Sequence, residues 1–217
     1  MRFLCLHGMG TNGRAIEPCV AAIRHTLGGH HTYEWLDGSI KTEMAPGIRD
    51  MVAKDDKFLL YADDSPETQV QALTDLIRFV DEEGPFDALM GFSHGAGCLA
   101  TYLLYRLQQG NASDTMAPIR CAVFFCGAPP QIPREFRKPG FKVNAGCIDI
   151  PTAHIWGKSD RLYGYGPELS ELCEAGLREE VVLDGGHEIP GAGDTPAVIR
   201  CVQAIRRTLA RAAAETI

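Results

Sequence analysis

A serine between two glycines is the residue of this chain best suited to act as a nucleophile. Residues 91–95 are Gly-Phe-Ser-His-Gly, which fits G-x-S-x-G, the pattern in which a tight turn exposes a serine hydroxyl. An apolar run, 86–90, precedes the turn, and a helical pattern follows from His94 to Gln109. Strand, turn and helix are the context that the motif requires, so we predict that Ser93 is a nucleophile.

The serine needs a base to take its proton, and seven histidines compete for that role. His187 follows Gly185-Gly186 directly after the last predicted strand, from where it can reach Ser93. His94 is adjacent to the serine but begins the helix with its side chain directed away from the serine oxygen. Of four others, His154 lies inside a strand, and His25, His30 and His31 lie at or after a helix end, where we expect them to be solvated. We therefore predict that His187 is the base.

A carboxylate must orient the histidine, and Asp160 is the acid placed for this task. It follows the predicted strand 154–156 in a polar loop. The order Ser93, Asp160, His187 is the order serine, acid, histidine found in one class of serine hydrolases. Asp149 precedes its strand and lies at the wrong end, whereas Asp184 and Glu188 flank the histidine and remain the alternatives.

Attack on a carbonyl also requires donors for the oxygen that becomes negatively charged. The backbone N–H of His94 is one candidate, because the start of a helix favours an anion. The second candidate is the backbone N–H of Met9, in the loop His7-Gly8-Met9-Gly10 after the first strand.

Strand and helix patterns alternate along the whole chain. Six short β-like runs are separated by amphipathic segments, and the strands are predicted at 2–6, 33–36, 86–90, 119–125, 154–156 and 180–183. Helices are predicted up to Leu27, from Ser65 to about Val80, over 94–109, around 167–176 and over 196–213. Such alternation indicates a single α/β domain, residues 1–217, with a mostly parallel sheet of about six strands covered by helices on both faces.

The predicted site residues leave the carboxyl ends of these strands, where such sheets bind ligands. Two excursions without a clear period, at about 37–63 and 127–150, are expected to shape a substrate pocket. Apolar side chains near the predicted loops are tentative pocket walls: Trp35, Tyr61, Phe92, Leu162 and Tyr163.

Composition excludes several other classes of function. The net charge of −7 argues against nucleic acid or an anionic membrane as partner, and no apolar stretch approaches the ~20 residues of a membrane span. The chain begins with a strand-like run that leaves no room for a signal peptide, so we expect its eight cysteines to be reduced thiols in the cytoplasm. No metal-ligand pattern stands out, and we expect no metal and no cofactor.

One motif supports a competing interpretation, in which the chain binds a dinucleotide. Gly8-x-Gly10-x-x-Gly13 matches the dinucleotide fingerprint G-x-G-x-x-G after the first strand, with Asp37 as its acid. A lone fingerprint is weak evidence, and it leaves the order of Ser93, Asp160 and His187 unexplained.

Four separated segments carry a family resemblance. LCLHGMGTNG (4–13), GFSHGA (91–96), HIWGKSD (154–160) and GGHEIP (185–190) resemble the small fungal α/β-hydrolases called the family of serine hydrolases. This resemblance spans nearly the whole chain and implies that Ser93, Asp160 and His187 form a catalytic triad, as predicted above from the residues. Many relatives carry glutamine at the position of His94; the oxyanion donor there is a backbone amide, so the triad is unaffected.

The first segment, with MAPGI (44–48), looks especially like members that accompany fungal polyketide synthases. Those are similar to thioesterases that release an acyl chain from a carrier protein, which implies an acyl carrier protein as partner. The alternatives are a general carboxylesterase, acyl transfer or cyclisation on the same residues, and a non-catalytic hydrolase-like binding protein.

Overall fold

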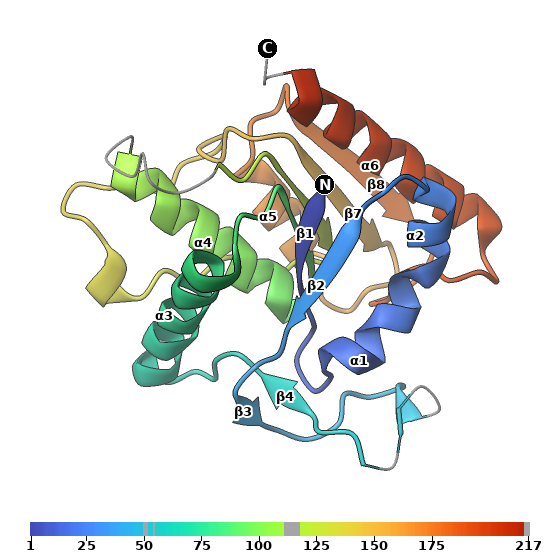
Figure 1. The fold of residues 1–217 in the computed structure, drawn as a ribbon, viewed down its shortest axis with the longest axis horizontal. Helices are drawn as coiled ribbons and strands as arrows, with labels where there is room; N and C mark the ends of the chain where they lie inside the picture. The colour runs from blue at the N-terminus through green and yellow to red at the C-terminus, as the bar shows by residue number, and fades with distance from the viewer. Residues whose placement is uncertain (50–51, 54, 111–117, 215–217) are drawn as a thin grey trace.

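Six strands form one parallel sheet in the order β2-β1-β5-β6-β7-β8 (Figure 1). The computed structural model describes residues 1–49, 52–53, 55–110 and 118–214. The strands of this sheet are β1 (Arg2–Leu6), β2 (Thr32–Leu36), β5 (Ala88–Phe92), β6 (Cys121–Phe125), β7 (Thr152–Gly157) and β8 (Arg178–Leu183). The predicted parallel α/β fold is confirmed.

Capping residues mark the ends of some of the helices. The bounds are α1 (Gly13–Ile16), α2 (Ala21–Leu27), α3 (Pro66–Glu83), α4 (His94–Gln109), α5 (Tyr165–Glu171) and α6 (Thr195–Ala214). The Ser65 side chain caps α3 by accepting a hydrogen bond from the Thr68 N–H. Gly110 ends α4 with a φ of +62°, a conformation that glycine adopts without a Cβ penalty.

Helices cover both faces of the sheet, and each face has its own apolar core. On one face α2 and α6 pack against the strands through residues such as Ile23, Val198 and Ile205. On the other face α3, α4 and α5 contribute Leu73, Leu99 and Leu169 to a second core (Figure 1). The central strands are apolar on both sides, as in β6, where all five residues are buried, because both faces are covered.

The first helical segment is broken at Pro18. A 3₁₀ turn over Glu17–Val20 separates α1 from α2, because proline cannot donate the hydrogen bond that a continuous helix needs. Most other differences from the predicted elements are at their ends. The strand expected over 86–90 runs instead over Ala88–Phe92, and α5 begins at Tyr165 rather than near Pro167.

The two excursions contain little regular structure. Within 37–63, β3 (Ile40–Lys41) and β4 (Leu59–Leu60) form a small antiparallel pair, which the sequence did not reveal; residues 50, 51 and 54 of this excursion lie outside the described residues. Within 127–150 the chain makes one 3₁₀ turn, Arg134–Phe136. None of the helices in the described part of the chain is long and apolar enough to cross a membrane.

Candidate active site

Ser93 occupies a strained turn between β5 and α4. Its φ is +53° and its ψ is −117°, which is unusual for a residue with a side chain and costs of order 1–3 kcal/mol. Backbone hydrogen bonds hold the turn: the Ser93 N–H donates to the Phe125 carbonyl over 2.9 Å, and the Ser93 carbonyl accepts from Ala128 over 3.1 Å. The turn lifts the hydroxyl out of the strand and toward the carboxyl edge of the sheet.

The structure brings Ser93, His187 and Asp160 into one hydrogen-bonded line. The Ser93 hydroxyl lies 2.8 Å from Nε2 of His187, and Nδ1 of His187 lies 2.7 Å from Oδ2 of Asp160. The Asp160 side chain is 2% exposed and that of His187 is 26% exposed. Oδ1 of Asp160 also accepts the Leu162 N–H over 2.7 Å, so both carboxylate oxygens are fixed. This arrangement can remove a proton from the serine and stabilise the resulting imidazolium.

The alternative acids point elsewhere. Asp184 is exposed and pairs with Lys158 over 2.8 Å, and Glu188 accepts a hydrogen bond from the Gly186 N–H. Asp149 is exposed.

Of the other histidines, His154 is buried and lies 3.1 Å from the Thr152 hydroxyl, while His25 and His30 are exposed. His31 is half-buried and contacts the N-terminal amino group over 3.1 Å, although we expected it to be solvated.

Two glycines let the loops of the site approach closely. A Cβ on Gly95 would collide with the His7 carbonyl oxygen and lie 2.7 Å from the Leu6 carbonyl carbon. A Cβ on Gly157 would collide with the carbonyl oxygens of Gly185 and Gly186. Glycine at 95 therefore seats the start of α4 on the end of β1, and glycine at 157 brings the Asp160 loop against the His187 loop.

The two expected oxyanion donors belong to Met9, on the loop after β1, and to His94, at the start of α4. Both residues line the same cavity, and Met9 is 55% exposed. Among the described residues, no side chain or carbonyl accepts a hydrogen bond from either amide, as expected for the first N–H groups of a helix. Both amides are therefore available to an incoming oxygen.

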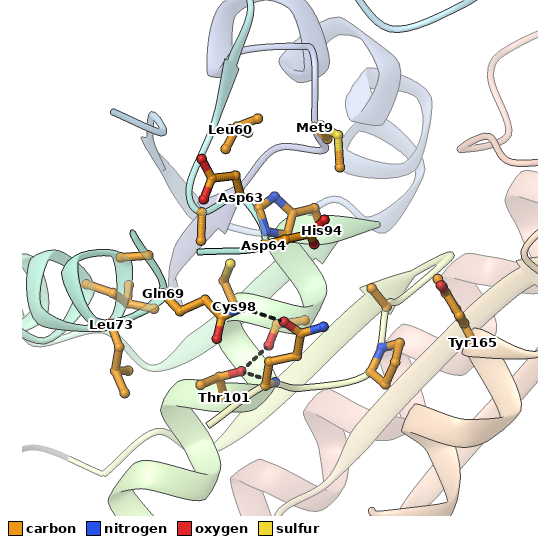
Figure 2. Close-up of a pocket in the computed structure, with 17 residues that line it drawn as sticks. Met9, Leu60, Asp63, Asp64, Gln69, Leu73, His94, Cys98, Thr101 and Tyr165 are labelled. Atoms are coloured by element: carbon orange, nitrogen blue, oxygen red, sulfur yellow. Dashed lines mark hydrogen bonds between the residues drawn. The ribbon is translucent and has the colours of Figure 1, made fainter. Parts of the chain in front are cut away.

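The cavity extends away from this point between α3 and α4 (Figure 2). Its volume is about 390 Å³, at the small end of ligand pockets. One wall is a face of α4 with His94, Gly97, Cys98 and Thr101, and the facing wall is α3 with Gln69, Ala72, Leu73 and Leu76. Leu60 and Asp63 of the first excursion and Pro129 of the second complete it. Burial lowers the pKa of His94 to about 4, so its imidazole is neutral at neutral pH.

The side chains expected as pocket walls do not line this cavity. Tyr61 is buried, and its hydroxyl accepts the His7 N–H and donates to the Leu36 carbonyl. Trp35 packs on the opposite core. The Phe92 ring lies 5.2 Å from the His187 ring, the Leu162 amide binds Asp160, and Tyr163 is 43% exposed. The walls come instead from α3 and α4. The small residues Gly97 and Cys98, one turn after His94, are the feature of the sequence that could have indicated a cavity along α4.

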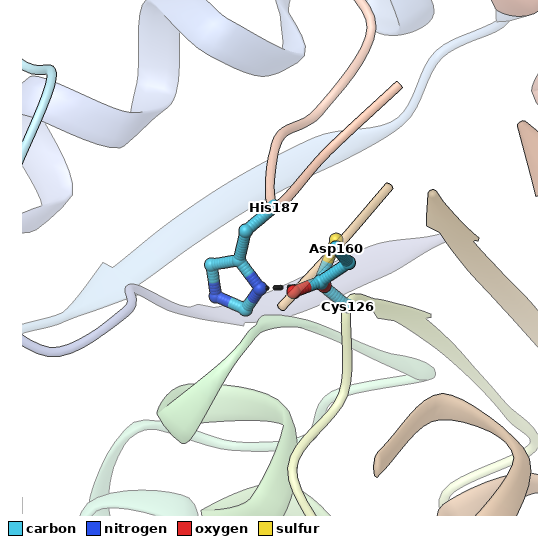
Figure 3. Close-up of side chains that lie close together, drawn as sticks. All are labelled: Cys126, Asp160 and His187. Carbon is cyan, nitrogen blue, oxygen red and sulfur yellow. Dashed lines mark hydrogen bonds and ion pairs between the residues drawn. The ribbon is translucent and has the colours of Figure 1, made fainter. Parts of the chain in front are cut away.

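Cys126 lies beside the acid and the base (Figure 3). Cys126, Asp160 and His187 are the one group in the described part of the chain whose ligand atoms are close enough to hold a metal ion. The group does not fit a metal centre, however. The His187 nitrogen that would bind is hydrogen-bonded to Asp160, and burial raises the pKa of the Cys126 thiol to about 12, which keeps it protonated whereas metals bind the thiolate.

The glycine-rich turn is not open to a dinucleotide. The Gly13 N–H already donates to the Asp37 carboxylate over 2.7 Å, and the Asn12 side chain caps the four-residue α1. Gly10 is covered by the first excursion, since its N–H donates to the Leu59 carbonyl and its carbonyl accepts the Ala45 N–H, each over 2.9 Å. The backbone groups that would hold a pyrophosphate are therefore already engaged.

Comparisons with known proteins identify the family to which the chain is similar. A family model described as serine hydrolase (FSH1) matches residues 1–195. The chain is 37% identical over 200 residues to the esterase FPY3 of Fusarium mangiferae, covering 88% of each protein. It is 32% identical over 195 residues to the hydrolase phiM of a fungal species, covering 87% of this chain and 86% of the relative.

Solved structures show the same fold at lower identity. A carboxylesterase of Mesorhizobium loti superposes with a TM-score of 0.60 at 18% identity, covering 94% of this chain and 88% of the other. The acyl-protein thioesterase 2 of Zea mays gives a TM-score of 0.58 at 16% identity, covering 96% and 93%.

Proposed function

The chain belongs to the FSH1 serine hydrolase family, and we propose that Ser93, His187 and Asp160 are its catalytic triad, acting on an acyl ester or thioester. The observation that carries the proposal is the continuous hydrogen-bonded line from the Ser93 hydroxyl through both imidazole nitrogens to the buried Asp160 carboxylate.

Acylation begins when Oγ of Ser93 attacks the substrate carbonyl carbon. Nε2 of His187 accepts the hydroxyl proton, and Asp160 stabilises the imidazolium through Nδ1–H. The carbonyl oxygen becomes an oxyanion, which the N–H groups of Met9 and His94 bind. Collapse of this intermediate breaks the bond to the leaving group, which departs as an alcohol or thiol with the proton from His187. An acyl-Ser93 ester remains.

Deacylation uses the same groups with water as the nucleophile. His187 takes a proton from the water as it attacks the acyl-enzyme. The tetrahedral intermediate then collapses to the free acid while His187 returns the proton to Oγ, which regenerates Ser93. If another nucleophile replaces water, the same residues support acyl transfer or cyclisation.

The cavity between α3 and α4 is our proposed site for the acyl chain. It begins at Met9 and His94, next to the nucleophile, and follows one face of α4 as far as Thr101. The seven residue steps from His94 to Thr101 span about 10 Å along the helix. Leu60, Leu73, Leu76 and Pro129 supply apolar surface, which suits a hydrocarbon chain better than a charged group.

For the physiological substrate we propose a thioester, with release of a polyketide acyl chain from an acyl carrier protein in the cytoplasm. The likeness of segments 4–13 and 44–48 to polyketide-associated members supports this choice, and the eight free cysteines suit a reducing compartment. The names of the relatives, esterase and hydrolase, favour a general carboxylesterase as the second candidate.

Matched substrates separate these candidates. The panel pairs N-acetylcysteamine thioesters with aryl esters of the same acyl chains, and kcat/KM is measured for both. The thioesterase proposal expects the thioesters to be preferred, whereas a strong preference for short aryl esters identifies a carboxylesterase. If Ser93→Ala is as active as the wild type, the triad itself is wrong.

A further inference from the structure

The carbonyl oxygen of Gly8 is held by two side chains in the interior. Nδ1 of His7 lies 2.7 Å from this oxygen, and the Thr11 hydroxyl donates to it over 2.8 Å. His7 is fully buried and Thr11 is 4% exposed, so water does not compete for either contact. Two buried donors on one carbonyl fix its direction more firmly than a single loop hydrogen bond does.

The partners of His7 determine which of its nitrogens carries the proton. Nε2 accepts the Gly38 N–H over 3.0 Å, so Nε2 must be unprotonated. In a neutral imidazole the proton is then on Nδ1, which donates to the Gly8 carbonyl. Burial lowers the pKa of His7, in agreement with a neutral ring.

Fixing the Gly8 carbonyl also fixes the Met9 amide, because both belong to one planar peptide group. In a trans peptide the C=O and the N–H point in opposite directions. With the carbonyl directed at His7 and Thr11 in the interior, the Met9 N–H is directed away from them, on the side where Met9 lines the cavity beside His94. A peptide free to rotate would present this N–H only part of the time.

We infer that His7 and Thr11 are positioning residues that clamp the Gly8–Met9 peptide so that the Met9 N–H is preorganised for the oxyanion. The inference rests on the proposed function, because it assumes that an oxyanion forms at Ser93. A preorganised donor stabilises the transition state without reorganising during the reaction. The clamp therefore acts on kcat and leaves binding of the ground-state substrate unchanged.

The surrounding contacts keep His7 itself in place. Its backbone N–H donates to the Tyr61 hydroxyl over 2.9 Å, and that hydroxyl donates to the Leu36 carbonyl. The His7 and Tyr61 rings lie 4.7 Å apart. The clamp thus connects the oxyanion loop to the ends of β2 and β4.

Thr11→Val removes the hydroxyl at nearly constant shape, and Thr11→Ser restores it. We expect Thr11→Val to lower kcat by roughly tenfold or more, below the 100- to 1000-fold loss of a complete oxyanion donor, with KM unchanged. Affinity for a trifluoromethyl ketone, which forms a tetrahedral adduct with the serine, should fall by the same factor. Thr11→Ser should recover most of both.

Three results would overturn the clamp. They are a folded Thr11→Val with wild-type kcat, an equal loss of kcat in Thr11→Val and Thr11→Ser, or a change in Thr11→Val that is confined to KM. Ser93→Ala distinguishes failure of the proposed function from failure of the clamp. The proposed function requires that this variant lose the activity of the wild type, and a variant that keeps the activity contradicts the proposed function itself. If Thr11→Val does not fold, nitrogen NMR of the wild type decides. The clamp requires a proton on Nδ1 and none on Nε2 of His7, and the opposite tautomer or an imidazolium contradicts it.

Discussion

The strained serine and the buried acid show what individual residues contribute to the site. Ser93 has a positive φ that its neighbours enforce through backbone hydrogen bonds, so the hydroxyl is held in position before any substrate arrives. The Asp160 carboxylate is also held in position, because one of its oxygens accepts the Leu162 N–H and the other is hydrogen-bonded to His187. Ser93 and Asp160, which are far apart in the sequence, are therefore both held in position before substrate binds.

Asp160→Asn tests whether this acid orients the base. The substitution keeps the size of the side chain but removes the negative charge that faces His187 Nδ1. We expect kcat to fall by roughly 1000- to 10,000-fold, the scale known for the equivalent change in serine proteases, with little change in the melting temperature. Initial rates on the preferred ester and a thermal melt measure both.

Asp184→Asn is the matched control for that substitution. Asp184 also lies near His187 in the sequence, but it is exposed and paired with Lys158. We expect its activity to stay within about twofold of the wild type, as is usual for exposed pairs of small energetic value. A loss of activity as large as that of Asp160→Asn would show that the acid role has been assigned to the wrong residue.

At the scale of elements, the gap between α3 and α4 determines what can bind. Both helices carry small residues where they face each other, Ala72 on α3 with Gly97 and Cys98 on α4, and this leaves the cavity open. The same start of α4 sits on β1 because position 95 is glycine. Helix α4 thus positions the nucleophile at its start and lines the cavity over its first two turns, from His94 to Thr101.

Cys98→Phe should shorten the cavity. Cys98 lies one turn beyond His94, about 6 Å along the helix, and its side chain lines the cavity. We expect kcat/KM for hexanoyl and longer esters to fall by tenfold or more, while acetyl and propionyl esters change little. A series of p-nitrophenyl esters of increasing chain length provides the measurement.

Leu107→Phe on the same helix is the control, because Leu107 is 37% exposed and lies outside the cavity. The profile of this variant should match that of the wild type. If Cys98→Phe reduces the rates for all chain lengths equally, the acyl chain does not follow α4.

The elements and the order of the site residues could be predicted from the sequence, but the pocket could not. Local patterns specify a strand or a helix: the bounds predicted for α4, His94 to Gln109, are those observed, and the chain order selected the three residues that the structure brings together. Pocket walls depend on which helix faces pack together over long sequence separations. Tyr61 shows the difficulty, since its hydroxyl serves His7 and Leu36, both distant in the sequence.

At the scale of the whole molecule, three histidines are kept neutral by the fold. Burial lowers the pKa of His7, of His94 to about 4 and of His154 to about 3. In the unfolded chain each imidazole takes up a proton near pH 6.5. Between these values the unfolded state binds more protons than the native state, so acidification favours unfolding.

We therefore expect stability to be fully present above about pH 6.5 and to decrease as the pH falls toward 4. Each of the three histidines contributes a slope of at most about 1.4 kcal/mol per pH unit. Urea denaturation between pH 7.5 and 4.5 measures the change, and His94→Gln should show a weaker dependence. Stability that is constant or increases on acidification over this range would contradict the assignment of neutral buried histidines.

The central claim is that Ser93 is the nucleophile, made reactive by His187 and Asp160 at the carboxyl edge of the sheet. Intact-protein mass spectrometry after reaction with a fluorophosphonate tests it most directly, since the probe phosphonylates an activated serine hydroxyl. We predict a single adduct that peptide mapping places on Ser93 and that is absent from folded Ser93→Ala. A folded wild-type protein that takes up no probe, or takes it up at another residue, would contradict this account.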